Sequence, residues 1–188
     1  MIDMLLKLGA QVCARDMKTQ EEKIDIATTL KAKGVQIKFG KDYLADIQTD
    51  LILKAPGIRP DRPELLRAVA QGAVLTNEME LFFALCPATI FGVTGSDGKT
   101  TTTTLIYEML KRQYGKAYVG GNIGVPLLPL VGQMSERDFA VVELSSFQLQ
   151  AMHTSPSVAV VTNISPNHLD WHTDMQEYIC LLYTSRCV

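Results

Sequence analysis

The stretch GVTGSDGKTTTTT, residues 92–104, combines the residue types needed to hold a phosphate group. Glycines recur at every third position from Gly92 to Gly98, and Lys99 and a run of threonines follow. Glycines let backbone N–H groups turn toward an anion, and the following helix N-terminus adds partial positive charge. The lysine can reach terminal phosphates, and the Thr100 hydroxyl can ligate Mg²⁺. A plain turn would not need the lysine, so the pattern favours a phosphate loop.

Polar groups also follow the next apolar runs along the chain. DFAVVE presents Glu143 at the end of an expected buried strand, with Ser145 and Gln148 close behind. Asn122 follows a short strand in YVGGN, and His168 lies in the loop after SVAVVTN. A carboxylate at the carboxyl end of a strand beside a phosphate loop is a usual second anchor for Mg²⁺. These residues are therefore candidates for a metal and substrate site.

Each of these residues also has a plain structural alternative. Glu143 could be a solvated strand end, and a lone histidine such as His168 is more often structural than a ligand. For Asp170 and His172 we favour a helix cap and a surface position. Three successive strand ends with groups suited to ATP, metal or substrate are much less expected by chance. The combination therefore favours a site.

Strand-like apolar runs alternate with helical patterns, which predicts an α/β fold with parallel sheets. Residues 1–86 are expected to form an incomplete Rossmann-like unit, because the chain opens inside a helix without a first strand or a GxGxxG turn. Residues 87–178 are expected to form a partial P-loop-type domain. The boundary is placed at Cys86–Pro87, to within about four residues.

Composition limits the classes of function. The chain has 188 residues, 47% of them hydrophobic and 20% charged, with a formal net charge of −2. The absence of a basic field disfavours nucleic acid as a partner. No apolar stretch approaches the ~18 residues that cross a bilayer, and the start lacks a signal-peptide pattern, so no membrane role is expected. The cysteines lack CxxC pairing, and we expect a reducing cytoplasm.

Four motifs together carry a resemblance to a known family. GVTGSDGKTTTT, GGNIGVPL, ELSSFQL and TNISPNHLDWH closely resemble, in this order and spacing, the Mur ligases. That family spells its phosphate loop GxxGxxGK[ST], which accommodates Val93 where a strict Walker motif has glycine. The resemblance covers the chain up to about Tyr178 and is greatest to the branch that adds D-glutamate.

The resemblance implies an ATP- and Mg²⁺-dependent ligase of peptidoglycan precursor synthesis, a process that serves cell-wall biogenesis, cell shape and cell division. ATP would phosphorylate the carboxylate of UDP-N-acetylmuramoyl-L-alanine, and the D-glutamate amine would attack the acyl phosphate. The first unit would bind the UDP part of the substrate. The full-length enzyme is expected to act as a monomer.

Residue roles carry over from the same motifs. The ATP phosphates would be bound by Gly95, Ser96, Asp97, Gly98, Lys99, Thr100 and Thr101. Thr100 and Glu143 would serve one Mg²⁺ and His168 a second, so that Lys99, Glu143 and His168 would be catalytic. Substrate contacts would come from Asp16, Lys18, Pro56, Gly57, Asn122, Ser145 and Gln148.

The sequence departs from the family in several places. Met17-Lys18 stands where relatives often have Thr-Arg, and Asn167 where many have aspartate. The family continues with a lysine-bearing helix and a further domain, whereas no lysine follows Lys116 here. We therefore expect a fragment that is inactive alone, in which residues 179–188 are a non-native tail that packs poorly.

Other functions stay open. The chain could belong to another Mur ligase, one that adds L-alanine or diaminopimelate/lysine, although ELSSFQL argues against this because those relatives vary most at that point. It could also be a non-catalytic nucleotide-binding module. A GTPase is disfavoured, because no NKxD-type guanine-reading loop is present.

Overall fold

The structure is a computed structural model that describes residues 1–183. Its contacts divide the chain into two compact units. The first unit consists of Met1–Leu51 and Asp61–Leu75, and the second of Ile52–Pro60 and the chain from Thr76 onward. The pairs β1–β2, β5–β7, β5–β8 and β6–β7 are all parallel, which confirms the predicted α/β class.

The first unit is built around a small parallel sheet. Its elements are α1 (Ile2–Lys7), β1 (Cys13–Asp16), η1 (Glu21–Lys23), α2 (Ile24–Ala32), β2 (Gln36–Phe39) and α3 (Pro63–Ala70). β1 pairs with β2, and Cys13 stands opposite Gln36. Gly34 follows α2 with a φ of +78°, a left-handed conformation that glycine adopts without strain and that commonly ends a helix. β3 (Leu51–Leu53) and β4 (Val74–Thr76) form a separate two-stranded sheet.

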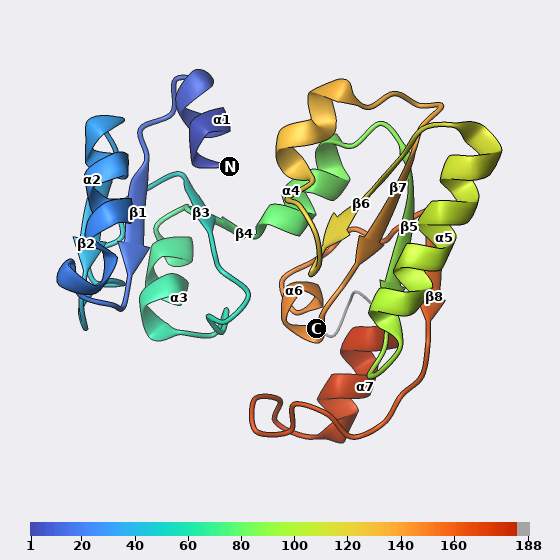
Figure 1. Ribbon diagram of the computed structural model, residues 1–188. Coiled ribbons are helices and arrows are strands. Elements are labelled where there is room, and N and C mark those ends of the chain that lie inside the picture. Colours follow the sequence, from blue (N-terminus) through green and yellow to red (C-terminus); the bar gives the residue numbers. More distant parts are fainter. Residues whose placement is uncertain (184–188) are drawn as a thin grey trace. The chain divides into compact units, whose positions relative to one another are not determined.

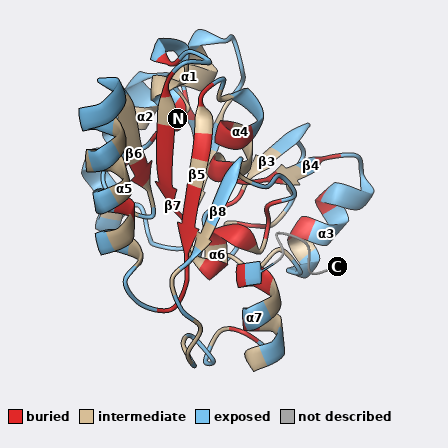
Figure 2. Ribbon diagram, turned by 90° about the vertical axis from the view of Figure 1, so that its right-hand side faces the viewer, coloured by how far each residue is buried: buried red, intermediate tan, exposed pale blue. Residues whose placement is uncertain are grey.

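The second unit holds a four-stranded sheet in the order β6-β7-β5-β8 (Figure 1). Its elements are α4 (Glu78–Leu85), β5 (Thr89–Thr94), α5 (Lys99–Tyr114), β6 (Ala117–Gly121), η2 (Leu128–Gln133), β7 (Phe139–Glu143), α6 (Ser146–Leu149), β8 (Val158–Val161) and α7 (Met175–Tyr183). Figure 2 shows buried residues concentrated on the two central strands, β7 and β5. Their continuous apolar runs are typical of a parallel sheet covered on both faces.

Strand register sets which residues meet at the carboxyl edge of this sheet. Glu143 at the end of β7 stands opposite Val93 of β5 on one side and Gly121 of β6 on the other. The loop after β5 and the turn after β6 therefore begin beside the same glutamate. This edge is where open parallel sheets bind their ligands.

The contacts within the chain group α4 with the second unit. The boundary predicted from the sequence, at Cys86–Pro87, lies after α4 and stays a prediction. Within the described residues, the expectation of a poorly packed tail from residue 179 is wrong. Residues 179–183 continue α7, and Leu181 and Leu182 are 4% and 5% exposed. Together with Tyr178 they follow helical spacing and so share one buried face. Residues 184–188 lie outside the described part.

Candidate active site

The loop between β5 and α5 has the backbone shape that its glycines predict. Gly98 has a φ of +77° immediately before α5 begins at Lys99. Gly95 has a φ of +134°, and a Cβ atom there would lie 2.1 Å from the Thr162 hydroxyl. Only glycine fits this second position, because both the dihedral angle and the close approach exclude a side chain. The arrangement of strand, glycine loop and helix N-terminus suits a phosphate.

The segment that follows β8 holds this loop from one side. The Ser96 amide donates to the Asn163 carbonyl at 3.1 Å, and the Asp97 amide donates to Asn163 Oδ1 at 2.9 Å. The Thr162 hydroxyl donates to the Asp97 carbonyl at 2.6 Å. Sequence reasoning missed Thr162, which lies directly after β8. The loop is therefore braced by side chains that the phosphate-loop motif does not include.

Lys99 lies half-buried over the loop that precedes it. Its ammonium donates to the carbonyls of Gly95 at 2.7 Å and Ser96 at 2.9 Å. Both carbonyls belong to the loop itself, so the positive charge is held beside the loop. A lysine ammonium in this position acts as a point charge for phosphate.

Glu143 is the buried acid of the carboxyl edge, with 2% exposure. Its Oε2 accepts from the Thr100 hydroxyl at 2.7 Å and its Oε1 from Asn122 Nδ2 at 2.9 Å. Both donors are neutral, and between them they give each carboxylate oxygen one hydrogen-bond partner. Gly121, with a φ of +99°, lets the turn after β6 lie close to the end of β7, since a Cβ atom at Gly121 would lie 2.3 Å from the Glu143 carbonyl oxygen.

The oxygen atoms of Thr100 and Glu143 fit a Mg²⁺ ion that also binds nucleotide phosphates. Mg²⁺ usually takes one or two carboxylates together with substrate oxygens and water. Within residues 1–183 no group of three or more His, Cys, Asp and Glu side chains is placed to hold a metal. The donor set on the protein side is therefore a carboxylate and a hydroxyl.

His168 lies in the loop beyond β8 and not at a strand end. It is exposed, has a φ of +54°, and its ring centroid lies 4.8 Å from that of Phe147. The structure thus brings Thr100, Asn122 and Glu143 together and places His168 against an aromatic ring. Its role as a metal ligand stays a prediction.

Ser145 and Gln148 form a capping box at the start of α6. Gln148 Oε1 accepts from the Ser145 amide at 2.9 Å, and the Ser145 hydroxyl accepts from the Gln148 amide at 3.3 Å. This arrangement explains the spacing of serine and glutamine in ELSSFQL. Gln148 is buried, with 7% exposure. Their predicted contact with substrate stays a prediction.

The remaining predicted substrate residues lie in two turns. In the first unit, Asp16 ends β1, and its Oδ1 accepts from the Lys18 amide at 2.9 Å. In the second unit, Pro56 and Gly57 occupy a turn closed by the Ile58 amide, which donates to the Ala55 carbonyl at 3.1 Å. Both turns are tied by local hydrogen bonds.

A buried lysine that sequence reasoning missed supports the second of these turns. Lys54 is 5% exposed, and its ammonium donates to the carbonyls of Ala55 at 3.3 Å and Pro56 at 3.5 Å. Burial penalises the charged form and lowers the pKa of Lys54 to about 8. Lysine is rarely buried, so neither pattern nor composition indicates this position.

Comparison with known proteins gives the family. Residues 93–180 match the Mur ligase middle domain. Over 180 residues, 95% of its length, the chain is 54% identical to the UDP-N-acetylmuramoylalanine--D-glutamate ligase of Clostridium kluyveri. It is 53% identical over the same share to the ligase of that name from Ruminiclostridium cellulolyticum. The chain belongs to the Mur ligase family. It spans 39% of the length of each of these relatives.

A solved Mur ligase shares the fold. The crystal structure of UDP-N-acetylmuramate:L-alanyl-gamma-D-glutamyl-meso-diaminopimelate ligase from Neisseria meningitides matches with a TM-score of 0.55 and 18% identity. The match covers 96% of this Mur ligase chain and 62% of that protein. In this Mur ligase chain, no helix among residues 1–183 is long and apolar enough to span a membrane.

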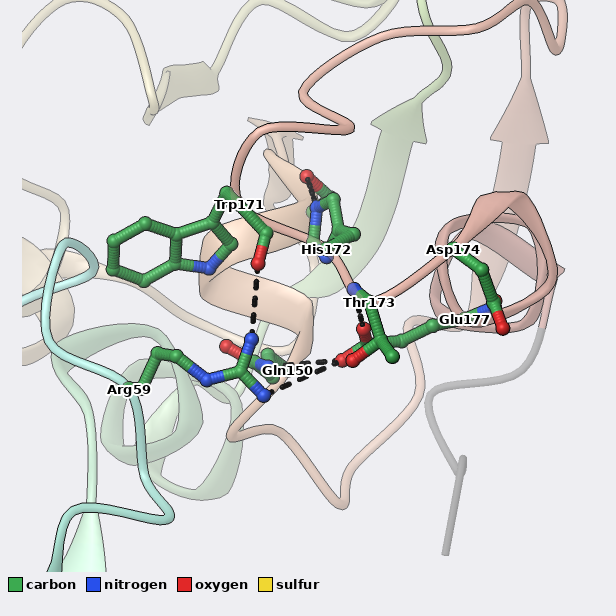
Figure 3. Close-up of polar contacts among 8 residues, drawn as sticks. Arg59, Gln150, Trp171, His172, Thr173, Asp174 and Glu177 are labelled. Atoms are coloured by element: carbon green, nitrogen blue, oxygen red, sulfur yellow. Dashed lines mark hydrogen bonds and ion pairs between the residues drawn. The ribbon is translucent and has the colours of Figure 1, made fainter.

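Near α7, this Mur ligase chain contains a cluster of polar side chains that the sequence motifs do not predict. Figure 3 shows Arg59 directed toward the Trp171 carbonyl and Glu177. Arg59 Nη1 donates to that carbonyl at 3.0 Å, and its Nη2 lies 4.0 Å from Glu177 Oε1. Burial raises the pKa of Glu177, but the hydrogen bonds from Thr173 and the positive charge of Arg59 together outweigh burial and leave that pKa below its usual value.

His172 belongs to the same region and corrects an expectation. It is 3% exposed, so the predicted surface position is wrong. Its Nε2 lies 2.9 Å from the Ser146 hydroxyl, and its ring stacks on Phe147 at a centroid distance of 5.7 Å. Burial lowers the pKa of His172 and favours the neutral imidazole.

Proposed function

We propose that this chain forms the nucleotide- and substrate-binding core of an ATP-dependent ligase that adds D-glutamate to UDP-N-acetylmuramoyl-L-alanine. The observation that carries the proposal is the meeting of the Lys99 loop with Thr100 and Glu143 at one sheet edge, in a chain 54% identical to a ligase of that name. The reaction serves peptidoglycan precursor synthesis, and we place it in the cytoplasm with a monomeric enzyme.

The proposed residues act mainly by positioning charge. The Gly95 and Gly98 amides and Lys99 bind the ATP phosphates, whereas the Ser96 and Asp97 amides hold the loop through Asn163. Thr101 extends the phosphate site into the first turn of α5. Thr100 and Glu143 would hold Mg²⁺, and the bound ion would supply positive charge against the phosphate oxygens. Because a triphosphate and a carboxylate must approach each other, the Lys99 ammonium lowers their mutual repulsion. The substrate carboxylate then attacks the terminal phosphorus, and ADP leaves.

The amide bond forms in a second step. The D-glutamate amine attacks the acyl phosphate, loses a proton, and releases inorganic phosphate. The Asn122 side chain donates to Glu143, the proposed Mg²⁺ ligand. We therefore place the muramoyl part of the substrate near the Asn122 amide. The turns at Asp16 and Lys18 and at Pro56 and Gly57 are proposed to contact the UDP part. High identity to D-glutamate ligases supports this amino acid over L-alanine or diaminopimelate.

A chimeric enzyme tests the proposal. Residues 1–178 of this chain replace the matching segment of the Clostridium kluyveri ligase, whose remaining length is kept. Phosphate release is measured with Mg·ATP and UDP-N-acetylmuramoyl-L-alanine, with and without D-glutamate. We expect D-glutamate-dependent release that Lys99→Ala abolishes. A folded chimera that releases phosphate with L-alanine or diaminopimelate as the acceptor, on the matching precursor, and not with D-glutamate would contradict the proposal.

A further inference from the structure

The Ser96 hydroxyl lies at the centre of a three-way contact beneath the phosphate loop. It donates to the Ser165 carbonyl at 2.8 Å and accepts from the Ser165 amide at 2.8 Å. The Tyr178 hydroxyl lies 3.0 Å from the same oxygen. A serine hydroxyl has one proton, and here it is committed to the Ser165 carbonyl. The phenol of Tyr178 must therefore be the donor to Ser96.

Both hydroxyl-bearing side chains are buried. Ser96 is 4% exposed and Tyr178 2%. Without the phenol proton, one lone pair of Ser96 would lose its partner where water has little access. An unsatisfied buried acceptor is more costly than the loss of an exposed hydrogen bond. The contact is therefore expected to fix the loop firmly.

Tyr178, the donor to Ser96, is held in place by contacts of the first turn of α7. Glu177, the neighbour of Tyr178, accepts from Gln150 Nε2 at 3.3 Å, and its amide donates to Asp174 Oδ1 at 2.8 Å. Arg59 lies against the same carboxylate (Figure 3). These contacts restrict the rotation and translation of the helix start. Tyr178 thus reaches the loop from a braced position.

We propose that Tyr178 is a positioning residue for the phosphate loop. Its hydroxyl fixes Ser96, and Ser96 anchors the start of the loop that Asn163 and Thr162 hold at Asp97. Tyr178 does not touch the nucleotide itself. The inference rests on the proposed function, in which this loop binds ATP phosphates. It adds a helix outside the motif to the nucleotide site.

The test compares Tyr178→Phe with a matched control in the 188-residue chain. The control is Tyr118→Phe on β6, which removes a hydrogen bond to the Gln133 carbonyl of 2.8 Å at an exposed position. Hydrogen exchange of the peptide covering residues 94–100 is measured without ligand. Affinity for Mg·ATP is measured by calorimetry. Ser96→Ala, which keeps the Tyr178 ring in place, is the second variant should Tyr178→Phe unfold.

We expect at least tenfold faster exchange in the loop and about tenfold weaker Mg·ATP binding for Tyr178→Phe, with neither change in Tyr118→Phe. Unchanged loop exchange in folded Tyr178→Phe, or equal changes in both variants, would overturn the inference. A wild-type chain that binds no Mg·ATP would instead count against the proposed function. The exchange measurement would still decide the role of Tyr178, because it needs no nucleotide.

Discussion

Lys54→Met removes a buried positive charge while keeping an unbranched side chain. Lys54 is 5% exposed as a residue, and burial lowers the pKa of its ammonium from 10.5 to about 8. At about 1.4 kcal/mol per pKa unit, a depression of this size corresponds to about 3 kcal/mol against the charged form. Loss of two long hydrogen bonds to carbonyls offsets about 1 kcal/mol of that. We expect the methionine variant to be about 2 kcal/mol more stable than wild type at pH 7.

The lowered pKa of Lys54 also predicts how the stability difference between wild type and Lys54→Met changes with pH. Because the folded pKa of Lys54 lies below the unfolded one, the unfolded chain binds more protons between about pH 8 and 10.5. Wild-type stability should therefore rise with pH across this window relative to the variant. The advantage of Lys54→Met should shrink as pH approaches 10.5.

Urea unfolding between pH 7 and 10 measures both quantities. Lys41→Met, at an exposed position, is the matched control and should follow the wild type. Free-energy curves for wild type and Lys54→Met that stay parallel from pH 7 to 10 would refute the reasoning. A variant less stable than wild type at pH 7 would show that the ammonium stabilises the turn at Ala55.

Three further outcomes follow from the packing and the site. Gly95→Ala should lower the unfolding free energy by at least ~2 kcal/mol in thermal or urea unfolding, because its Cβ would meet Thr162; wild-type stability would contradict the assigned loop geometry. Leu181→Ala should cost about 2–5 kcal/mol, since this side chain is 4% exposed. A negligible change in its melting temperature would restore the idea of a loose tail. Glu143→Gln should keep the fold and remove the Mg²⁺ dependence of ATP binding, measured by titrating Mg²⁺ at fixed ATP; retained dependence would place the metal elsewhere.

Local signals were enough to predict the loop and the edge of the sheet. The glycines at 95 and 98 mark a left-handed backbone and a close approach, which depend on residue type alone. Glu143 could be placed because a parallel strand ends at that residue. The spacing of Tyr178, Leu181 and Leu182 also indicates the buried face of α7, although the sequence after residue 178 departs from the family pattern.

Contacts between distant segments could not be predicted in the same way. Arg59 meets Glu177 only because the chain folds two remote segments together, and neither residue sits in a recognisable pattern. Burial of Lys54 and His172 likewise depends on neighbours supplied by the tertiary fold. The Tyr178 contact with Ser96 is of this kind, since each residue looks ordinary in its own segment.

Binding of Mg·ATP to the chain, measured by calorimetry in wild type, Lys99→Ala and Asp170→Ala, tests the central claim most directly. Lys99 supplies charge beside the loop, whereas Asp170 is exposed and serves as a charge-changing control. We predict that wild type and Asp170→Ala bind with similar affinity and that Lys99→Ala binds at least tenfold more weakly. Equal affinity of folded Lys99→Ala and wild type would contradict the assignment of this loop as the phosphate site.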